Sequence, residues 1–127
     1  CTAHRELDGD DCTHPELLYK ATHKNHPSAV WTRQCSRNYI WLYYLWRELC
    51  KEYTYRYEKT HLTEKKLGKI LKTPPKNLKS KDLTPFAQAM PDKYKNSDVT
   101  KAYRKYYIND KNHLADWKKR EKPLWFI

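Results

Sequence analysis

Glycine occurs only twice in the 127 residues of this chain, as Gly9 and Gly68. Sheet proteins need many tight turns, and several turn types depend on glycine. No segment alternates apolar and polar residues for long enough to predict a strand. The same scarcity argues against a glycine-rich phosphate-binding loop. We therefore predict an all-α fold in which residues 1–127 form one compact helical domain.

The strongest helical pattern begins at Ser36, which can serve as the N-cap of a long helix ending near Tyr57. Apolar side chains recur in it every three or four positions, at Tyr39, Leu42, Leu45, Trp46, Leu49 and Tyr53. A stripe of this kind is most often a core-facing surface, and we expect it to be buried. A second long amphipathic helix is predicted to begin near Ser97 and to continue its inner face as far as Trp117.

Shorter elements and loops lie before and between these helices. The polar segment 12–27 contains two His-Pro pairs and predicts a loop. A short helix capped by Thr63 should stop at the proline pair 74–75. Residues 74–91 are rich in proline and lysine, and we expect them to form an ordered wrapping loop, because Phe86 and Met90 need a buried environment.

The charge of the chain indicates its partner. Twenty-six Lys and Arg residues against 15 Asp and Glu give a formal net charge of +11, which attracts polyanions. Eleven tyrosines, among them Tyr55, Tyr57, Tyr94 and Tyr107, add rings that can stack on exposed bases. We expect a nucleic acid as the partner, with DNA as the first expectation; the sequence leaves both DNA and RNA open. The candidate binding residues are Lys24, Arg37, Lys65, Lys69, Lys101, Arg104 and Lys105.

Localisation follows from what the sequence lacks. No run approaches the roughly 18 apolar residues of a membrane span, and no signal peptide is visible. We expect no membrane association and a cytoplasmic protein with four reduced cysteines. The chain begins at Cys1 rather than at methionine, so we expect either that it is processed or that it is a fragment whose natural N-terminal segment is missing.

One polar constellation could carry chemistry. His23 and His26 lie in the predicted loop, and Arg33 follows on a short helix with Arg37 one turn later. Histidine can relay protons and arginine can clamp phosphate, so His23, His26 and Arg33 are the candidate catalytic residues. In the alternative, these side chains only cap helices and brace the loop.

A metal site is the weaker hypothesis for the same region. Cys12, His14, His23 and His26 are residue types that bind zinc, but their spacing matches no familiar zinc motif. We expect no metal and no cofactor.

Several stretches resemble a small family of bacteriophage and environmental proteins. They are His26–Arg33, Ser36–Leu42, Leu83–Pro91, Ala102–Tyr107 and Trp117–Trp125. The layout is also similar to the pyrimidine-dimer DNA glycosylases of bacteriophage, which are small, basic and helical. That resemblance implies base excision, with an amine nucleophile that forms an imine and a guiding glutamate. Those enzymes use their own N-terminal amine, a role that Cys1 does not inherit, and no glutamate here matches by motif.

Three functions therefore remain open from sequence. The first is a DNA-acting protein of phage type, including a glycosylase or lyase directed at damaged pyrimidines. The second is a noncatalytic nucleic-acid-binding accessory protein that uses the same basic surface. The third is a structural or interaction protein whose charge serves solubility.

Overall fold

The computed structural model describes all residues, 1–127, and confirms the all-α prediction. Its internal contacts divide the chain into two compact units, Cys1–Thr84 and Pro85–Ile127. None of the helices combines the length and the apolar character needed to cross a bilayer.

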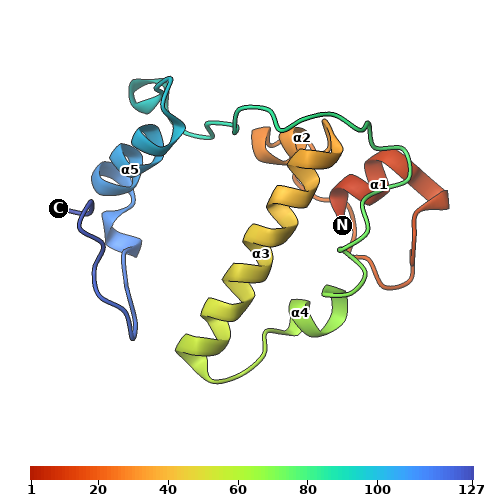
Figure 1. Ribbon diagram of the computed structural model, residues 1–127, viewed down its shortest axis with the longest axis horizontal. Coiled ribbons are helices and arrows are strands. Elements are labelled where there is room, and N and C mark those ends of the chain that lie inside the picture. The colour runs from red at the N-terminus through yellow and green to blue at the C-terminus, as the bar shows by residue number, and fades with distance from the viewer. The chain divides into compact units, whose positions relative to one another are not determined.

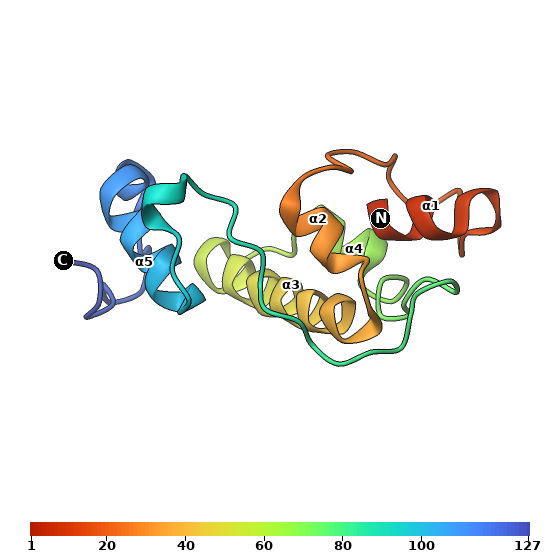
Figure 2. The same cartoon turned by 90° about the horizontal axis from the view of Figure 1, so that it is seen from above.

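The first unit contains four α-helices, labelled in Figures 1 and 2, and a 3-10 helix at Gly9–Asp11. Their bounds are Thr2–Asp8 for α1, Pro27–Thr32 for α2, Ser36–Tyr57 for α3 and Leu62–Leu67 for α4. Helix α2 packs against both α1 and α3, and both views show it beside the start of α3. Residues 12–26 contain no helix, as the two His-Pro pairs predict.

Two helices begin at other N-cap residues than the sequence predicts. The N-cap of α3 is Cys35, so Ser36 is the first helical residue. His61 rather than Thr63 caps α4, because its imidazole Nδ1 accepts the backbone N–H of Thr63 at 3.1 Å. Thr63 instead places its hydroxyl 2.8 Å from the same nitrogen.

The predicted apolar stripe of α3 is buried only in part. Tyr39 is 5% exposed, whereas Leu42, Leu45 and Leu49 are 37%, 49% and 64% exposed. The expectation that the whole stripe faces a core is therefore wrong. The reason is that α2 and α4, at six residues each, are too short to cover a helix of 22 residues.

Buried polar side chains hold the segment after α4 against the first three helices. Asp8 accepts the backbone N–H groups of Lys76 and Asn77 at 2.8 and 3.0 Å. Although burial opposes the shift, these two bonds hold the pKa of the Asp8 carboxyl below its usual range. Farther along, the backbone N–H of Ser36 donates to the carbonyl of Lys79 at 2.8 Å.

Asn38 makes the most complete set of these bonds. Its side chain is fully buried, and its amide nitrogen donates to the Trp31 carbonyl at 2.9 Å and to the Thr84 hydroxyl at 2.8 Å. Its amide oxygen accepts the backbone N–H of Thr84 at 3.0 Å. One side chain thus ties α2 and the end of the first unit to α3.

A second buried contact joins α1 to α3. The Tyr39 hydroxyl donates to the Leu71 carbonyl at 2.7 Å, and the His4 Nε2 atom lies 2.9 Å from the same hydroxyl. Because the Tyr39 proton is used by Leu71, the imidazole donates its Nε2–H to the Tyr39 oxygen. Burial lowers the pKa of His4, so the folded state favours the neutral ring.

The second unit is built on α5, Val99–Asp110. Asp98 caps it by accepting the backbone N–H of Lys101 at 3.1 Å. Met90, Tyr94 and Ala102 form its core. The helix ends at Asp110, so the prediction that it carries Trp117 on its inner face is wrong.

The C-terminal residues of this unit make aromatic contacts after α5 has ended. Trp117 packs on Phe126 with ring centroids 4.7 Å apart, and the Arg104 guanidinium lies 5.3 Å from the Trp125 ring. Leu124 and Ile127, by contrast, are exposed.

The first prediction concerns Asn38. A buried partner left without its bond costs about 1–3 kcal/mol, so Asn38→Ala should lower the free energy of unfolding by roughly 2 kcal/mol or more. Urea denaturation measures this loss. The matched control is Asn25→Ala, which truncates an exposed asparagine and should change stability by less than about 0.5 kcal/mol. Equal effects of the two substitutions would contradict the role given to Asn38.

The second prediction concerns pH. The pKa of His4 is lower in the folded than in the unfolded state, so the unfolded chain binds the additional proton first as the pH falls. Stability contributed by the neutral ring is present above the unfolded pKa, about 6.5, and is lost as the pH falls from there toward the folded pKa. Urea midpoints measured from neutral to mildly acidic pH should decline, and His4→Gln should flatten this decline.

Candidate nucleic-acid interface

Helix α4 and the turn after it bring four lysines to one side of α3. Leu67, 3% exposed, anchors α4 in a cluster with Cys12 and Leu18. The charged positions of the segment are Lys65, Lys66, Lys69 and Lys72, and all four are exposed. Burial of the leucine on one side of the segment therefore leaves the lysines in solvent on another.

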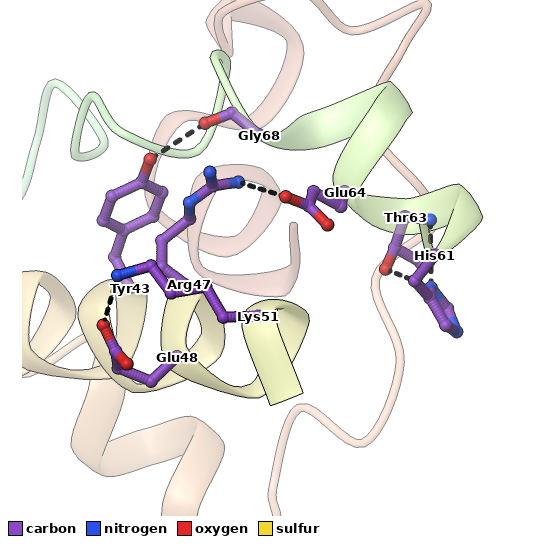
Figure 3. A network of polar contacts seen from close by, with 8 residues as sticks. All are labelled: Tyr43, Arg47, Glu48, Lys51, His61, Thr63, Glu64 and Gly68. Atoms are coloured by element: carbon purple, nitrogen blue, oxygen red, sulfur yellow. Dashed lines mark hydrogen bonds and ion pairs between the residues drawn. The ribbon is translucent and has the colours of Figure 1, made fainter. Parts of the chain in front are cut away.

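Two side chains of α3 point toward this segment (Figure 3). The Tyr43 hydroxyl donates to the Gly68 carbonyl at 2.9 Å. One guanidinium nitrogen of Arg47 lies 3.5 Å from a carboxylate oxygen of Glu64. Arg47 and Glu64 are both largely shielded from solvent, with side chains 32% and 20% exposed. These contacts fix the distance between α3 and α4.

A groove of 680 Å³ lies between these elements. Besides Tyr43, Gly68 and Ile70, its lining consists of charged residues: Arg47, Glu64, Lys65, Lys66, Lys69 and Lys72. The one carboxylate is paired with Arg47, whereas the four lysines form no ion pair with any carboxylate. The groove therefore carries five positive charges against one negative charge. We name it the basic groove.

Gly68 is required in the basic groove for space. Its φ of −55° is helical and available to any residue, so conformation does not select glycine here. A Cβ atom at this position would lie 2.8 Å from the Glu64 carbonyl oxygen and 3.0 Å from an Arg47 guanidinium nitrogen. The first of these atoms belongs to the preceding turn of α4 and the second to the mobile end of an α3 side chain, so it is mainly the α4 turn itself that leaves no room for a side chain here.

A cluster of aromatic rings in tilted and edge-to-face contact lies at the far end of α3. The Tyr53 ring centroid is 4.9 Å from that of Tyr57 and 4.7 Å from that of His61. Tyr57 is 47% exposed, and Tyr55 on the same helix is 46% exposed. In the second unit, Tyr107 is exposed, but Tyr94 is buried with its hydroxyl donating to Asp110 at 2.7 Å. Tyr94 is therefore not exposed for stacking.

The structure brings some of the predicted binding residues together and separates others. Lys65 and Lys69 both line the basic groove. Lys24 and Arg37 are exposed elsewhere in the first unit and do not line it. Lys101, Arg104 and Lys105 are exposed on α5 in the second unit, where the Lys101 amine lies 4.0 Å from Asp98.

The candidate catalytic residues are held by local contacts. His23 and His26 are exposed; the His23 Nδ1 lies 2.9 Å from the Thr22 hydroxyl, and His26 caps α2 by accepting the Ser28 N–H at 3.1 Å. Arg33, just after α2, is half-buried. None of the three lines the basic groove. His26 thus caps α2, and His23 contacts its neighbour in the loop.

The residues considered for zinc do not assemble. Cys12 is buried beside Leu18 and Leu67, whereas His14, His23 and His26 are exposed. No three His, Cys, Asp or Glu side chains in the chain come close enough to hold a metal ion together. Cys1, Cys12, Cys35 and Cys50 are free thiols.

Sequence reasoning missed the part played by Arg47, Tyr43 and Glu64. The helical period places Arg47 away from the apolar stripe of α3, which is correct, but it does not show that α4 lies on that side. Gly68 itself was the available signal, since a glycine within a helical pattern often marks a close approach. In the structure, a Cβ atom at Gly68 would meet Arg47.

Comparisons with known proteins add no assignment to this geometry. No protein-family model, no curated protein and no solved structure matches the chain. Function must therefore be argued from the residues themselves.

The third prediction tests the close approach at Gly68. Gly68→Ala places a methyl group against a backbone oxygen that cannot move independently, and overpacking of this kind costs about 1–3 kcal/mol. Thermal or urea unfolding should show destabilisation, although alanine is the better helix former. Unchanged or increased stability would show that the last turn of α4 can adjust to hold a side chain at this position.

Proposed function

We propose that this protein binds nucleic acid through the basic groove, with the phosphate backbone as the group recognised. The observation that carries this proposal is the set of four exposed lysines with no carboxylate partner around one groove. Lysines that are not neutralised by the protein are free to neutralise phosphates and to release their counterions. A solubilising surface does not require cations to gather at one groove.

The two kinds of cation have different roles in this proposal. Lys65, Lys66, Lys69 and Lys72 are point charges on flexible stems, suited to phosphates along a backbone of any sequence. Arg47 already faces Glu64, so it positions α4 and contributes less to binding. The net charge of +11 adds long-range attraction that accelerates the encounter.

Aromatic side chains supply the second contact. Tyr57 is exposed beside Tyr53 and His61, and stacking of a base on such a ring contributes about 1–3 kcal/mol in proteins that bind single strands. Stacking and phosphate contacts are both tolerant of sequence, which favours binding with little base specificity. DNA remains the partner expected from the sequence.

The fourth prediction tests the basic groove. The double variant Lys65→Gln/Lys69→Gln should weaken binding of labelled DNA and lower the slope of log affinity against log salt by about 2, since each phosphate contact contributes roughly 0.9 on duplex DNA. Fluorescence anisotropy over a salt series measures both quantities. The control is Lys79→Gln/Lys81→Gln, which removes the same charge from exposed positions outside the groove.

Two outcomes would contradict the proposal. Equal effects of the two double variants would mean that only the total charge matters, not the groove. Absence of wild-type binding at low salt would leave the interaction or structural protein as the function, with the charge serving solubility.

A separate cleavage assay on the same DNA tests catalysis, which the resemblance to phage glycosylases suggests. Ultraviolet-irradiated duplex would be incubated with the protein beside the undamaged duplex. Strand breaks or a borohydride-trapped adduct on irradiated DNA alone would support a glycosylase or lyase. Binding without product would support the noncatalytic accessory protein, which the basic groove favours.

A further inference from the structure

A second pocket lies along α3, beyond the basic groove. Its volume is 420 Å³, within the range of about 300–1,000 Å³ that is usual for small-molecule sites. The C-terminal half of α3, the start of α4 and the residue that caps α4 line it. Four of the lining side chains carry rings: Trp46, Tyr53, Tyr57 and His61. We name it the aromatic pocket.

The rings of the aromatic pocket offer both faces and edges. Tyr53 and Tyr57 have centroids 4.9 Å apart and are inclined at 47°, whereas His61 meets Tyr53 edge-on at 4.7 Å and 84°. Leu49 and Tyr57 are exposed, so the pocket opens to solvent at these residues, and the buried Cys50 closes its inner end. A flat ring can therefore enter and pack on an aromatic face while the chain that carries it stays outside.

The aromatic pocket adjoins the basic groove. Thr63 lines the pocket and Glu64, the next residue of α4, lines the groove (Figure 3). On α3, Cys50 of the pocket follows Arg47 of the groove by about one turn. Burial raises the pKa of the Cys50 thiol and the Glu64 carboxylate raises it further, so the inner end of the pocket lies within electrostatic reach of the groove. One ligand can therefore occupy both sites.

A nucleic-acid strand matches this arrangement in charge and in length. Arg47 and Tyr57 are separated by about 15 Å along α3, at 1.5 Å per residue. About four or five stacked nucleotides span that distance, at roughly 3.4 Å each. Phosphates can then lie along the lysines of the groove while one base packs against Tyr57. A base of a duplex is stacked and paired, and the loss of both contacts opposes its entry into the pocket.

We propose that the aromatic pocket holds one unpaired base of a single-stranded nucleic acid whose phosphates lie in the basic groove. This inference rests on the proposed function, because the groove supplies the phosphate contacts that bring the strand to the pocket. It adds the substrate class, a single strand in preference to a duplex. Glu52 and Arg56 in the pocket wall pair with each other at 2.9 Å, so recognition depends on ring contact and tolerates any base.

The fifth prediction compares three labelled ligands of equal length, about 12 nucleotides. They are a single strand of thymidine nucleotides, the duplex of this strand with its complement, and a strand of abasic nucleotides, which keeps the phosphates and lacks the bases. The wild-type protein should bind the thymidine strand about fivefold or more tightly than the abasic strand, because one stacked base contributes at least such a factor, and more tightly than the duplex. Fluorescence anisotropy at low salt measures the dissociation constants.

Substitutions on α3 separate the aromatic pocket from its surroundings. Tyr57→Ala should weaken binding of the thymidine strand about fivefold and leave the abasic strand and the duplex unchanged, because only stacking is lost. Tyr57→Phe keeps the ring and should bind as the wild type does. The matched control is Tyr44→Ala, which truncates an exposed tyrosine that lines neither the pocket nor the groove and should leave all three affinities unchanged.

The possible failures have different meanings. Absence of binding by all three ligands at low salt would overturn the proposed function and this inference together. Equal binding of the abasic strand or the duplex, still dependent on Lys65 and Lys69, would leave the basic groove in place and overturn the base site. A preference for the thymidine strand that survives in folded Tyr57→Ala would also overturn it. The comparison of ligands on the wild-type protein decides the matter even where that variant does not fold.

Discussion

The arrangement of the first unit depends on satisfying backbone groups of a segment that forms no helix. After α4 the chain runs to Thr84 past α1, α2 and α3. Its backbone groups hydrogen-bond to buried or partly buried side chains instead of to a helix or a neighbouring strand. These side chains are the Asp8 carboxylate, the Tyr39 hydroxyl and the Asn38 amide. Buried peptide groups need such partners, and few apolar residues lie in this segment. The helices are thereby held around an irregular segment by hydrogen bonds to its backbone as well as by apolar contacts.

Local sequence signals predicted the helices better than their packing. The period of α3 and the start of α5 near Ser97 could be predicted from neighbouring residues, and the all-α class followed from the two glycines and the lack of alternating segments. Burial of Leu45 and Leu49 was predicted wrongly because it depends on how far α2 and α4 extend. Helix α5 ends early, at Asp110, and Trp117 packs on Phe126 instead of on the inner face of the helix. A helical period in the sequence carries no information about such a contact.

The candidate interface shows the same division between local and distant information. Lys65 and Lys69 could be selected from charge and spacing, and they do line the basic groove. Arg47 and Tyr43 could not, because their importance comes from the approach of α4 across 20 or so residues of chain. His26 was selected for its chemistry, yet its imidazole serves as a helix cap, a use that competes with catalysis at the same nitrogen.

Helix α4 presents different residues to two surroundings. Thr63 and Leu67 line an apolar cavity among α1, α2, α3 and α4, whereas Lys65 and Lys66 line the basic groove. Successive residues of a helix are turned by about 100°, so their order within six residues decides which side each one occupies. A residue inserted between Thr63 and Leu67 would turn everything after it and carry a lysine toward the cavity. Homologous chains should therefore vary freely in which cation they carry along this helix, but not in its length.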